Sequence, residues 1–154
     1  MRGMFFVLNF NMISRSHQPA YTPETGQVAD RHRILIVDDE PAILFAYRKL
    51  FEKEGMCVDT SSCIVDAVRR VNNLHYTAVV ADVRLAGTEN EDGLEFLRVL
   101  RKEHPTTLMI IATGCSSNKI ETKVRALGVV HYFEKPVQPA ALVAVLKNFA
   151  NLQN

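Results

Sequence analysis

The feature of this sequence that most restricts its fold is a regular alternation, from Arg33 onward, of two kinds of segment. Short apolar runs rich in β-branched residues, typical of strands buried on both faces, alternate with longer segments whose apolar residues repeat at helical spacing. The predicted strands cover residues 34–37, 57–60, 76–83, 108–112 and 129–133. The second run is the less apolar, so we expect it nearer an edge of the sheet.

Helices are predicted between these strands and after the last one. They begin at Pro41, near Ile64, at Gly93, at Asn118 and at Pro139. Asn118 and Glu121 have the spacing of a capping box, and Gly128 ends that helix. Five strands that alternate with five helices through short turns predict an α/β domain, with a five-stranded parallel sheet doubly wound by helices on both faces.

The composition indicates one ordinary domain. The chain has 154 residues, of which 47% are hydrophobic and 23% charged, enough for a full core. The net charge is +1 and no long basic run occurs, so we expect no direct nucleic-acid binding. The three cysteines show neither metal-binding nor redox spacing, which is typical of reduced thiols in a cytoplasmic protein.

Residues 1–30 differ from the rest, and we predict a flexible extension there, with the domain over residues 31–154. The apolar run Met4–Phe10 is too short to cross a bilayer, which takes about 20 apolar residues, so no membrane insertion is expected. Asn9 and Asn11 interrupt the run and no small-residue cleavage site follows, which argues against a signal peptide. A start codon placed too far upstream is the other explanation.

Polar side chains follow four of the predicted strands. The first strand ends in Asp38-Asp39-Glu40 and the third in Asp82, whereas Thr113 and Lys135 follow the fourth and fifth. Singly, such residues are more often caps, turn residues or surface groups. Ligands of parallel sheets bind beyond the carboxyl ends of the strands, so we expect these side chains to meet at one edge.

The clustered acids imply a cation. Two carboxylates about 4 Å apart repel by about 4 kcal/mol at an effective dielectric constant near 20. Hard oxygen ligands with open positions suit Mg²⁺, or Mn²⁺, which keeps bound waters and accepts phosphate oxygens. An ammonium such as that of Lys135, beside a metal-bound carboxylate, can stabilise a transferring phosphoryl group, and the Thr113 hydroxyl can hydrogen-bond it.

The sequence resembles the receiver domains of two-component response regulators, which have a flavodoxin-like fold. The stretches that match are ILIVDDEP, VVADVRL followed by DGLEFL, IIATG and HYFEKP, between about Arg33 and Asn148. The resemblance implies that Asp82 is the phosphoacceptor and that Thr113 and Lys135 contact the phosphoryl group. It also implies a metal site formed by Asp38, Asp39, Asp82 and the backbone carbonyl of Arg84. Tyr132 would be the aromatic switch residue, and the Lys135–Pro136 bond would be cis.

Three positions depart from the pattern of the family. The loop after Asp82, LAGTENEDG, is about three residues longer than usual and lacks proline. Arg84 places a long cation beside the acceptor, where it can shield the acyl phosphate or pair with its oxygens. Gln138 replaces a capping Asp, which predicts a looser start of the last helix.

The expected function is that of a single-domain response regulator, with no enzymatic activity beyond its own phosphorylation and dephosphorylation. The donor would be a sensor histidine kinase or a phosphotransfer protein. Because only six residues follow Asn148, the output is expected through contact with a downstream protein. One alternative is a haloacid-dehalogenase-type phosphatase, which needs a second Asp where Arg84 stands. Another is a receiver-fold interaction module without phosphotransfer.

The last predicted helix offers a candidate signalling face. Its buried stripe needs only Leu142, Val145, Leu146 and Phe149. The remaining positions hold only one charge, Lys147, and include several small or apolar residues: Ala140, Ala141, Val143, Ala144 and Ala150. Alanine is simply a good helix former, which is the plainer explanation. The functional hypothesis is a protein-binding face, with a possible homodimer through the fourth and fifth helices.

Overall fold

The computed structural model describes residues 32–84, 91–114 and 117–152, so the predicted extension over residues 1–30 and much of the loop after Arg84 lie outside it. The observed elements are β1 (Arg33–Val37), α1 (Pro41–Lys53), β2 (Cys57–Ser61), α2 (Ile64–Asn73), β3 (Ala78–Ala81), α3 (Glu91–Glu103), β4 (Leu108–Thr113), α4 (Asn118–Ala126), β5 (His131–Glu134) and α5 (Pro139–Asn151). The predicted α/β fold is confirmed, with element ends shifted by up to two residues.

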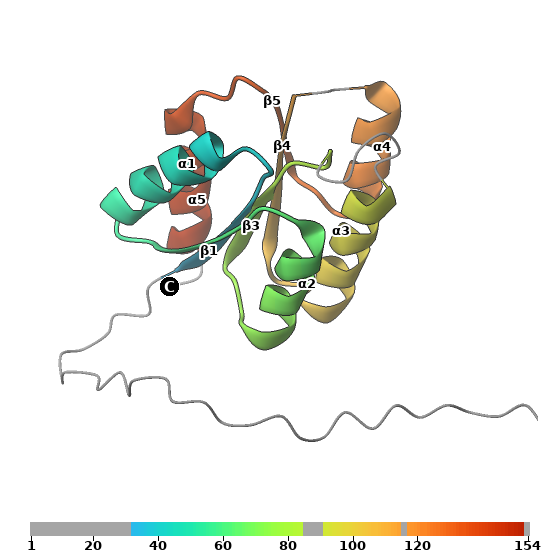
Figure 1. The fold of residues 1–154 in the computed structure, drawn as a ribbon, viewed down its shortest axis with the longest axis horizontal. Helices are drawn as coiled ribbons and strands as arrows, with labels where there is room; N and C mark the ends of the chain where they lie inside the picture. Colours follow the sequence, from blue (N-terminus) through green and yellow to red (C-terminus); the bar gives the residue numbers. More distant parts are fainter. Residues whose placement is uncertain (1–31, 85–90, 115–116, 153–154) are drawn as a thin grey trace, which may run out of the picture.

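The five strands form one parallel sheet in the order β2-β1-β3-β4-β5 (Figure 1). The less apolar β2 lies at an edge, as its composition predicts. The order reverses at β1, since β2 lies on one side of it and β3 on the other. Ligands of such sheets bind at this reversal, beyond the carboxyl ends of the strands.

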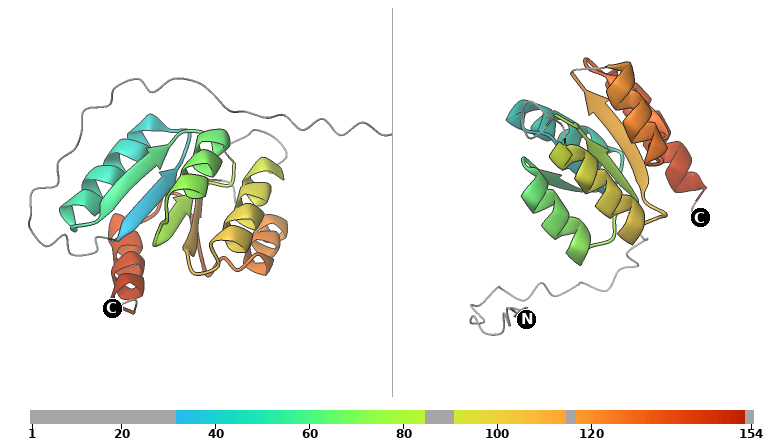
Figure 2. Two further views of the ribbon diagram at one scale, coloured as in Figure 1. Left: turned by 90° about the horizontal axis from the view of Figure 1, so that it is seen from below. Right: turned by 90° about the vertical axis from the view of Figure 1, so that its right-hand side faces the viewer.

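Alternate side chains of the strands fill two separate cores. Leu35 and Val37 of β1 lie in the core covered by α2, α3 and α4, whereas Ile34 and Ile36 lie in the core covered by α1 and α5 (Figures 1 and 2). All four are at most 1% exposed, and burial of such a side chain stabilises the fold by about 1.5–3 kcal/mol. The two cores hold the sheet rigid, and with it the edge where the polar residues gather.

The N-terminus of α4 differs from the prediction. Ser117 is the N-cap, and its hydroxyl accepts a hydrogen bond of 3.2 Å from the backbone N–H of Ile120. The capping box predicted at Asn118 and Glu121 is therefore wrong. Serine caps a helix as well as asparagine, and Ser117 stands one residue earlier, so the helix already includes Asn118. The Glu121 carboxylate instead pairs with Arg125 at 2.7 Å, one turn further along the helix.

Helix α5 also corrects one predicted position. Ala150 is 7% exposed and belongs to the buried stripe, because it follows Leu142 and Leu146 at intervals of four residues. Val143, predicted at the surface, is half-buried against the core, whereas Ala144 is exposed. The apolar surface of α5 is thus smaller than the sequence predicts. The N-cap residue Gln138 makes no side-chain capping bond, and the looser start of α5 stays a prediction.

Among the described residues no helix has both the length and the apolar character that a membrane crossing requires.

Candidate functional site

Main-chain hydrogen bonds at the carboxyl ends of the strands bring the predicted site residues together. Val37 of β1 is in register with Ala81 of β3, so the residues that follow them, Asp38 and Asp82, emerge side by side. The N–H of Asp82 donates to the carbonyl of Val37 at 2.9 Å. The N–H of Lys135 donates to the carbonyl of Thr113 at 2.8 Å, which fixes the lysine beside the end of β4.

The Lys135 ammonium is the centre of the site. Its Nζ lies 2.6 Å from Oδ2 of Asp38 and 3.1 Å from Oδ2 of Asp82. Oε1 of Glu40 approaches the same Nζ at 3.3 Å. Asp38 and Asp82 are only 3% and 6% exposed, so one cation bridges two carboxylates that are almost wholly removed from water. Charge-assisted hydrogen bonds of this length are stronger than neutral ones.

The second oxygen of each buried carboxylate accepts a backbone hydrogen bond. Oδ1 of Asp38 accepts from the N–H of Glu40 at 3.0 Å, and Oδ1 of Asp82 accepts from the N–H of Arg84 at 2.9 Å. Each acid thus turns the chain that follows its strand, in the manner of an Asx turn. As a result both side chains are held from two sides, with one oxygen on the main chain and the other on Lys135.

The electrostatics of the cluster follow from its burial. Burial raises the pKa of Asp38 above its ordinary value, an effect that the hydrogen bonds from Lys135 and Glu40 only partly offset. Burial alone lowers the pKa of Lys135, but its hydrogen bonds to Asp38 and Asp82 outweigh this and raise the pKa well above the usual lysine value. Lys135 therefore stays charged at neutral pH. A second cation bound beside the two buried carboxylates would stabilise their negative charge further.

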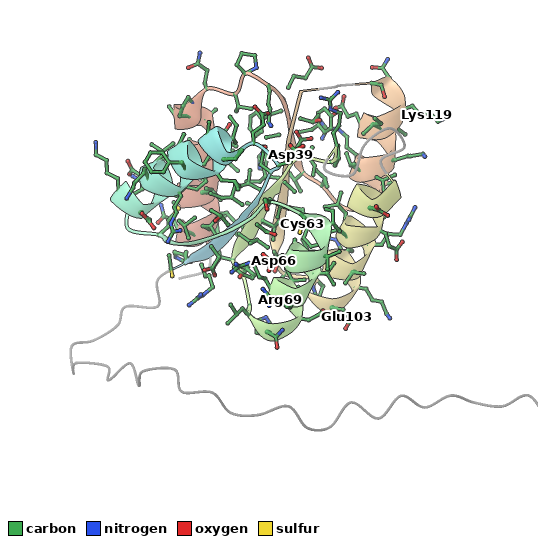
Figure 3. The ribbon with its side chains drawn as sticks, in the orientation of Figure 1. Asp39, Cys63, Asp66, Arg69, Glu103 and Lys119 are labelled. Atoms are coloured by element: carbon green, nitrogen blue, oxygen red, sulfur yellow. The ribbon has the colours of Figure 1, made fainter. Side chains whose placement is uncertain are left out.

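The two other acids after β1 behave differently from Asp38. Asp39, a predicted metal ligand, is exposed at the same edge of the sheet (Figure 3). Glu40 was not assigned a role from the sequence, yet its carboxylate contacts Lys135. The only sequence signal for it is the run of three acids, which does not show which of them turns inward. The metal-binding role of Asp39 stays a prediction.

The other predicted residues lie around the cluster. Thr113 is fully buried at the end of β4. Arg84 is exposed, and its guanidinium lies over the end of β4, since a Cβ added to Gly114 would come within 4.0 Å of it. Tyr132 of β5 is half-buried, with its hydroxyl oxygen inside the protein, and packs against the core beneath α2, α3 and α4. The Lys135–Pro136 bond is cis, as expected.

Tyr47 is a neighbour of the cluster that the sequence places only on the apolar face of α1. Its side chain is 6% exposed and stacks on Phe51. Burial raises the pKa of its phenol, and the charges of Lys135 and Asp38 act on it as well, which places the ring close to the cluster.

The donor set fits a hard divalent cation. Mg²⁺ is commonly bound through one or two carboxylates and completes its octahedron with waters and substrate oxygens. Asp38 and Asp82 supply two carboxylates whose nearest counter-charge is an ammonium, which a cation can join or displace. Within residues 32–84, 91–114 and 117–152, no three His, Cys, Asp or Glu side chains are grouped to hold a metal ion.

Comparison with known proteins agrees with this geometry. Residues 34–147 match the family model of the response regulator receiver domain. The nitrogen assimilation regulatory protein NtrX of Azorhizobium caulinodans is 33% identical over 116 residues, which are 74% of this chain and 25% of that protein. This chain thus spans about a quarter of the length of the curated relatives it matches.

Solved structures give the same result. A CheY-like response regulator receiver domain protein from Methanospirillum hungatei JF-1 is 29% identical, with a TM-score of 0.74 over 80% of this chain and 96% of that one. The beryllofluoride-activated NtrC4 receiver domain dimer is 26% identical, with a TM-score of 0.67 over 76% and 94% of the two chains. The shared fold, the matched family model and the acids and lysine at the strand ends make this chain a member of the response regulator receiver domain family.

Proposed function

We propose that Asp82 accepts a phosphoryl group from a phosphohistidine, on a sensor histidine kinase or a phosphotransfer protein, in a Mg²⁺-dependent reaction. The observation that carries this proposal is the Lys135 ammonium, held between the buried carboxylates of Asp38 and Asp82. A charge-stabilised carboxylate at the reversal point of a parallel sheet is placed to act as a nucleophile. An interaction module would have no need of two buried acids on one lysine.

In the proposed reaction a carboxylate oxygen of Asp82 attacks phosphorus, and the phosphorus–nitrogen bond of the phosphohistidine breaks. An acyl phosphate forms, and the imidazole nitrogen keeps the electron pair of the broken bond. Mg²⁺, when held by Asp38, Asp39, Asp82 and the backbone carbonyl of Arg84, would neutralise charge on the phosphoryl oxygens. The Lys135 ammonium lies 3.1 Å from Oδ2 of Asp82, so it can contact an oxygen of the new group with little movement.

The signal would pass to the surface through Thr113 and Tyr132. Thr113 ends β4 beside Lys135, and Tyr132 lies on the adjacent strand in register with Ile111. We propose that Thr113 moves toward the phosphoryl oxygens and that Tyr132 turns into the space Thr113 vacates, which changes the α4–β5–α5 surface. That surface would bind a downstream protein or a second copy of the chain. The NtrC4 receiver domain, a solved relative, is a dimer in its beryllofluoride-activated form.

Three further expectations belong to this proposal. The chain would act in the cytoplasm, without direct nucleic-acid contact, and would catalyse no reaction beyond its own phosphorylation and dephosphorylation. It would also work as a single-domain regulator, although the NtrX relative is about three times as long. The mass of the protein purified from its native cells tests the last point, because a single-domain regulator has a mass close to 17.3 kDa.

The central experiment is phosphorylation by acetyl phosphate in the presence of Mg²⁺, followed by intact-protein mass spectrometry. We expect the wild-type chain and Asp92→Asn, which removes an exposed carboxylate outside the site, to gain one phosphoryl group. Asp82→Asn, which is nearly isosteric, should fold normally and gain none. Labelling of Asp82→Asn at the wild-type rate would move the acceptor to another residue.

The same experiment separates the two alternatives. A haloacid-dehalogenase-type phosphatase would hydrolyse acetyl phosphate over many turnovers, so acetate release would greatly exceed the amount of protein. An interaction module without phosphotransfer would take no label and release no acetate. A receiver accumulates label up to one group per chain, then loses it slowly once the donor is removed.

A further inference from the structure

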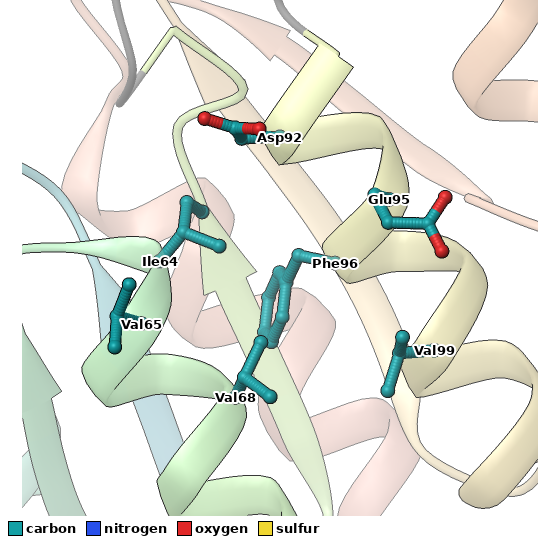
Figure 4. Close-up of a pocket in the computed structure, with 7 residues that line it drawn as sticks. All are labelled: Ile64, Val65, Val68, Asp92, Glu95, Phe96 and Val99. Atoms are coloured by element: carbon teal, nitrogen blue, oxygen red, sulfur yellow. The ribbon is translucent and has the colours of Figure 1, made fainter. Parts of the chain in front are cut away.

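A pocket of about 370 Å³ lies between α2 and α3, away from the phosphorylation site. Ile64, Val65 and Val68 of α2 face Phe96 and Val99 of α3 across it (Figure 4). Phe96 is 1% exposed and belongs to the core, whereas Val65 is 81% exposed. The pocket is therefore an extension of the core that opens to the surface.

The pocket also carries a charge. The seven residues that line it include two acids, Asp92 and Glu95 on α3, and no lysine or arginine. The Asp92 carboxylate lies at the end of the pocket nearest the start of α3 (Figure 4). The volume is at the small end of the range of about 300–1,000 Å³ for ligand pockets, so it suits one or two aromatic side chains and not a whole helix. The matching ligand is an aromatic-rich segment with positive charge.

The chain itself contains such a segment. Residues 4–10, MFFVLNF, carry three phenylalanines, and the nearest charges on either side are Arg2 and Arg15. The first acidic residue of the chain is Glu24, so the whole region before it is cationic. Its aromatic content and its charge are both complementary to the pocket.

The chain that connects this segment to the domain is long enough for the segment to reach the α2–α3 pocket. Twenty-one residues separate Phe10 from His32, where the described structure begins. A flexible linker of that length has a root-mean-square span of about 25 Å. A domain of this size has a radius of gyration of only about 14 Å, so every point on its surface is within reach. Tethering at this distance gives an effective concentration on the order of millimolar, and modest contacts therefore suffice.

We propose that the N-terminal segment, through Phe5 and Phe6, docks into the α2–α3 pocket of its own domain. The docked segment covers Val65 and Val68 and places its arginines near Asp92 and Glu95. The site is independent of phosphoryl transfer, because none of the seven lining residues belongs to the Asp38–Asp82–Lys135 cluster.

The chain contains no tryptophan, so Phe5→Trp introduces a single fluorescent reporter into the full-length protein. We expect its emission to be blue-shifted and its quenching by acrylamide to be reduced several-fold relative to the unfolded chain. Adding Val65→Glu, an exposed position that folding tolerates, should shift the emission to the red and restore quenching. Val130→Glu is the matched control, since Val130 is 62% exposed but lies before β5, and it should leave the emission unchanged.

A solvent-exposed tryptophan in the parent variant overturns the proposal. So does a blue shift that persists in both Val65→Glu and Val99→Glu, because the segment would then dock elsewhere. Measuring the emission of the Phe5→Trp variant over a series of protein dilutions tests whether the segment docks within its own chain. Emission that stays constant on dilution supports docking within one chain, whereas a blue shift that is lost on dilution shows that the pocket binds the segment of a second copy.

Discussion

Lys135 stabilises the receiver by compensating two buried negative charges at once. Removing one partner of a buried ionic cluster typically costs about 3–5 kcal/mol, and the cost falls when a remaining acid can take up a proton. The raised pKa of Asp38 makes that response available. We therefore expect Lys135→Met to lower the free energy of unfolding by about 2–3 kcal/mol in EDTA, measured by urea denaturation.

Mg²⁺ should reduce this loss, because a cation on Asp38 and Asp82 replaces part of the missing charge. The double variant Lys135→Met/Asp38→Asn should also recover most of it. Lys49→Met is the control. Lys49 is exposed and its ammonium lies as far as 3.9 Å from the Glu52 carboxylate, so its loss should lower the free energy of unfolding by less than about 0.5 kcal/mol. A Lys135→Met variant as stable as the wild type in EDTA would mean that the acids are not repelling each other.

Asp66 gives a pH dependence whose sign is fixed. Hydrogen bonds from Arg70 and Arg69 lower the pKa of its carboxyl from 3.8 to about 2. The folded state thus binds fewer protons than the unfolded state in this window, so the stabilisation is present above pH 3.8 and is lost as the pH falls toward 2. Because the pair lies at the surface, the contribution should be no more than about 1 kcal/mol.

Asp66→Asn should accordingly reduce stability near neutral pH and reduce it less near pH 2, as measured by urea unfolding across this range. High salt should shrink the difference between the variant and the wild type, since the ion pairs with Arg69 and Arg70 are open to solvent. A difference that does not change with pH would assign the effect of Asp66 to something other than its charge.

Among the elements, the end of α4 is tied to α3 by the side chain of Arg101. The Arg101 guanidinium donates to the carbonyls of Leu127, Gly128 and Pro105 at 3.1, 2.7 and 2.8 Å. Gly128 has a φ of +89°, and a Cβ there would collide with Arg101. Gly55 has almost the same φ, +86°, but a Cβ there would meet nothing within 4 Å. Alanine substitutions at the two glycines therefore separate the cost of backbone strain from the cost of contact with Arg101.

We expect Gly55→Ala to cost about 1 kcal/mol, the usual penalty for a side chain in the left-handed region. Gly128→Ala should cost about 1–2 kcal/mol more, because it also displaces the Arg101 hydrogen bonds. Thermal or urea unfolding of both variants measures the difference. The additional cost of Gly128→Ala should vanish when Arg101 is also replaced by alanine. Equal costs at the two glycines in the wild-type background would show that the Arg101 side chain moves aside.

The elements could be predicted from the sequence because their signals are local. Apolar strands, helical periodicity and the prolines at the start of α1 and α5 identified all ten elements in order. The details that were wrong depend on contacts or on a choice between equivalent residues. Ser117 and Asn118 are equally good caps, and the burial of Ala150 follows from how far α5 extends along the sheet.

The candidate site was partly predictable for the same reason. The positions of Asp38, Asp82, Thr113 and Lys135 follow from the rule that parallel strands end at one edge. The bridging role of Lys135 and the contact of Glu40 with Lys135 do not, since they depend on side-chain conformations after the strand has ended. The α2–α3 pocket is lined by side chains from two helices that are separate in the sequence, so no spacing of residues along the chain indicates it.

At the scale of the whole molecule, the two sides of the domain have different proposed partners. The α2–α3 pocket would bind the chain's own N-terminal segment, whereas the α4–β5–α5 surface would bind another protein once Asp82 is phosphorylated. Ala140 and Ala144 are exposed on α5, and the nearby Lys147 pairs with Glu54, the C-cap residue of α1, so it adds little free charge to this surface. A small apolar surface of this kind supports association only when a second change, such as the turn of Tyr132, completes it.

Activation should therefore convert monomer to dimer. In sedimentation velocity with beryllofluoride and Mg²⁺ we expect a dimer that is absent without them. Ala144→Glu should weaken it at least 10-fold, about 1.4 kcal/mol, because a buried carboxylate would face the apolar surface of the partner copy. Val65→Glu, on the other side of the domain, should dimerise like the wild type. If the wild-type chain stays monomeric under these conditions, the target of this surface is a different protein. Ala144→Glu should then abolish capture of that protein by the activated chain.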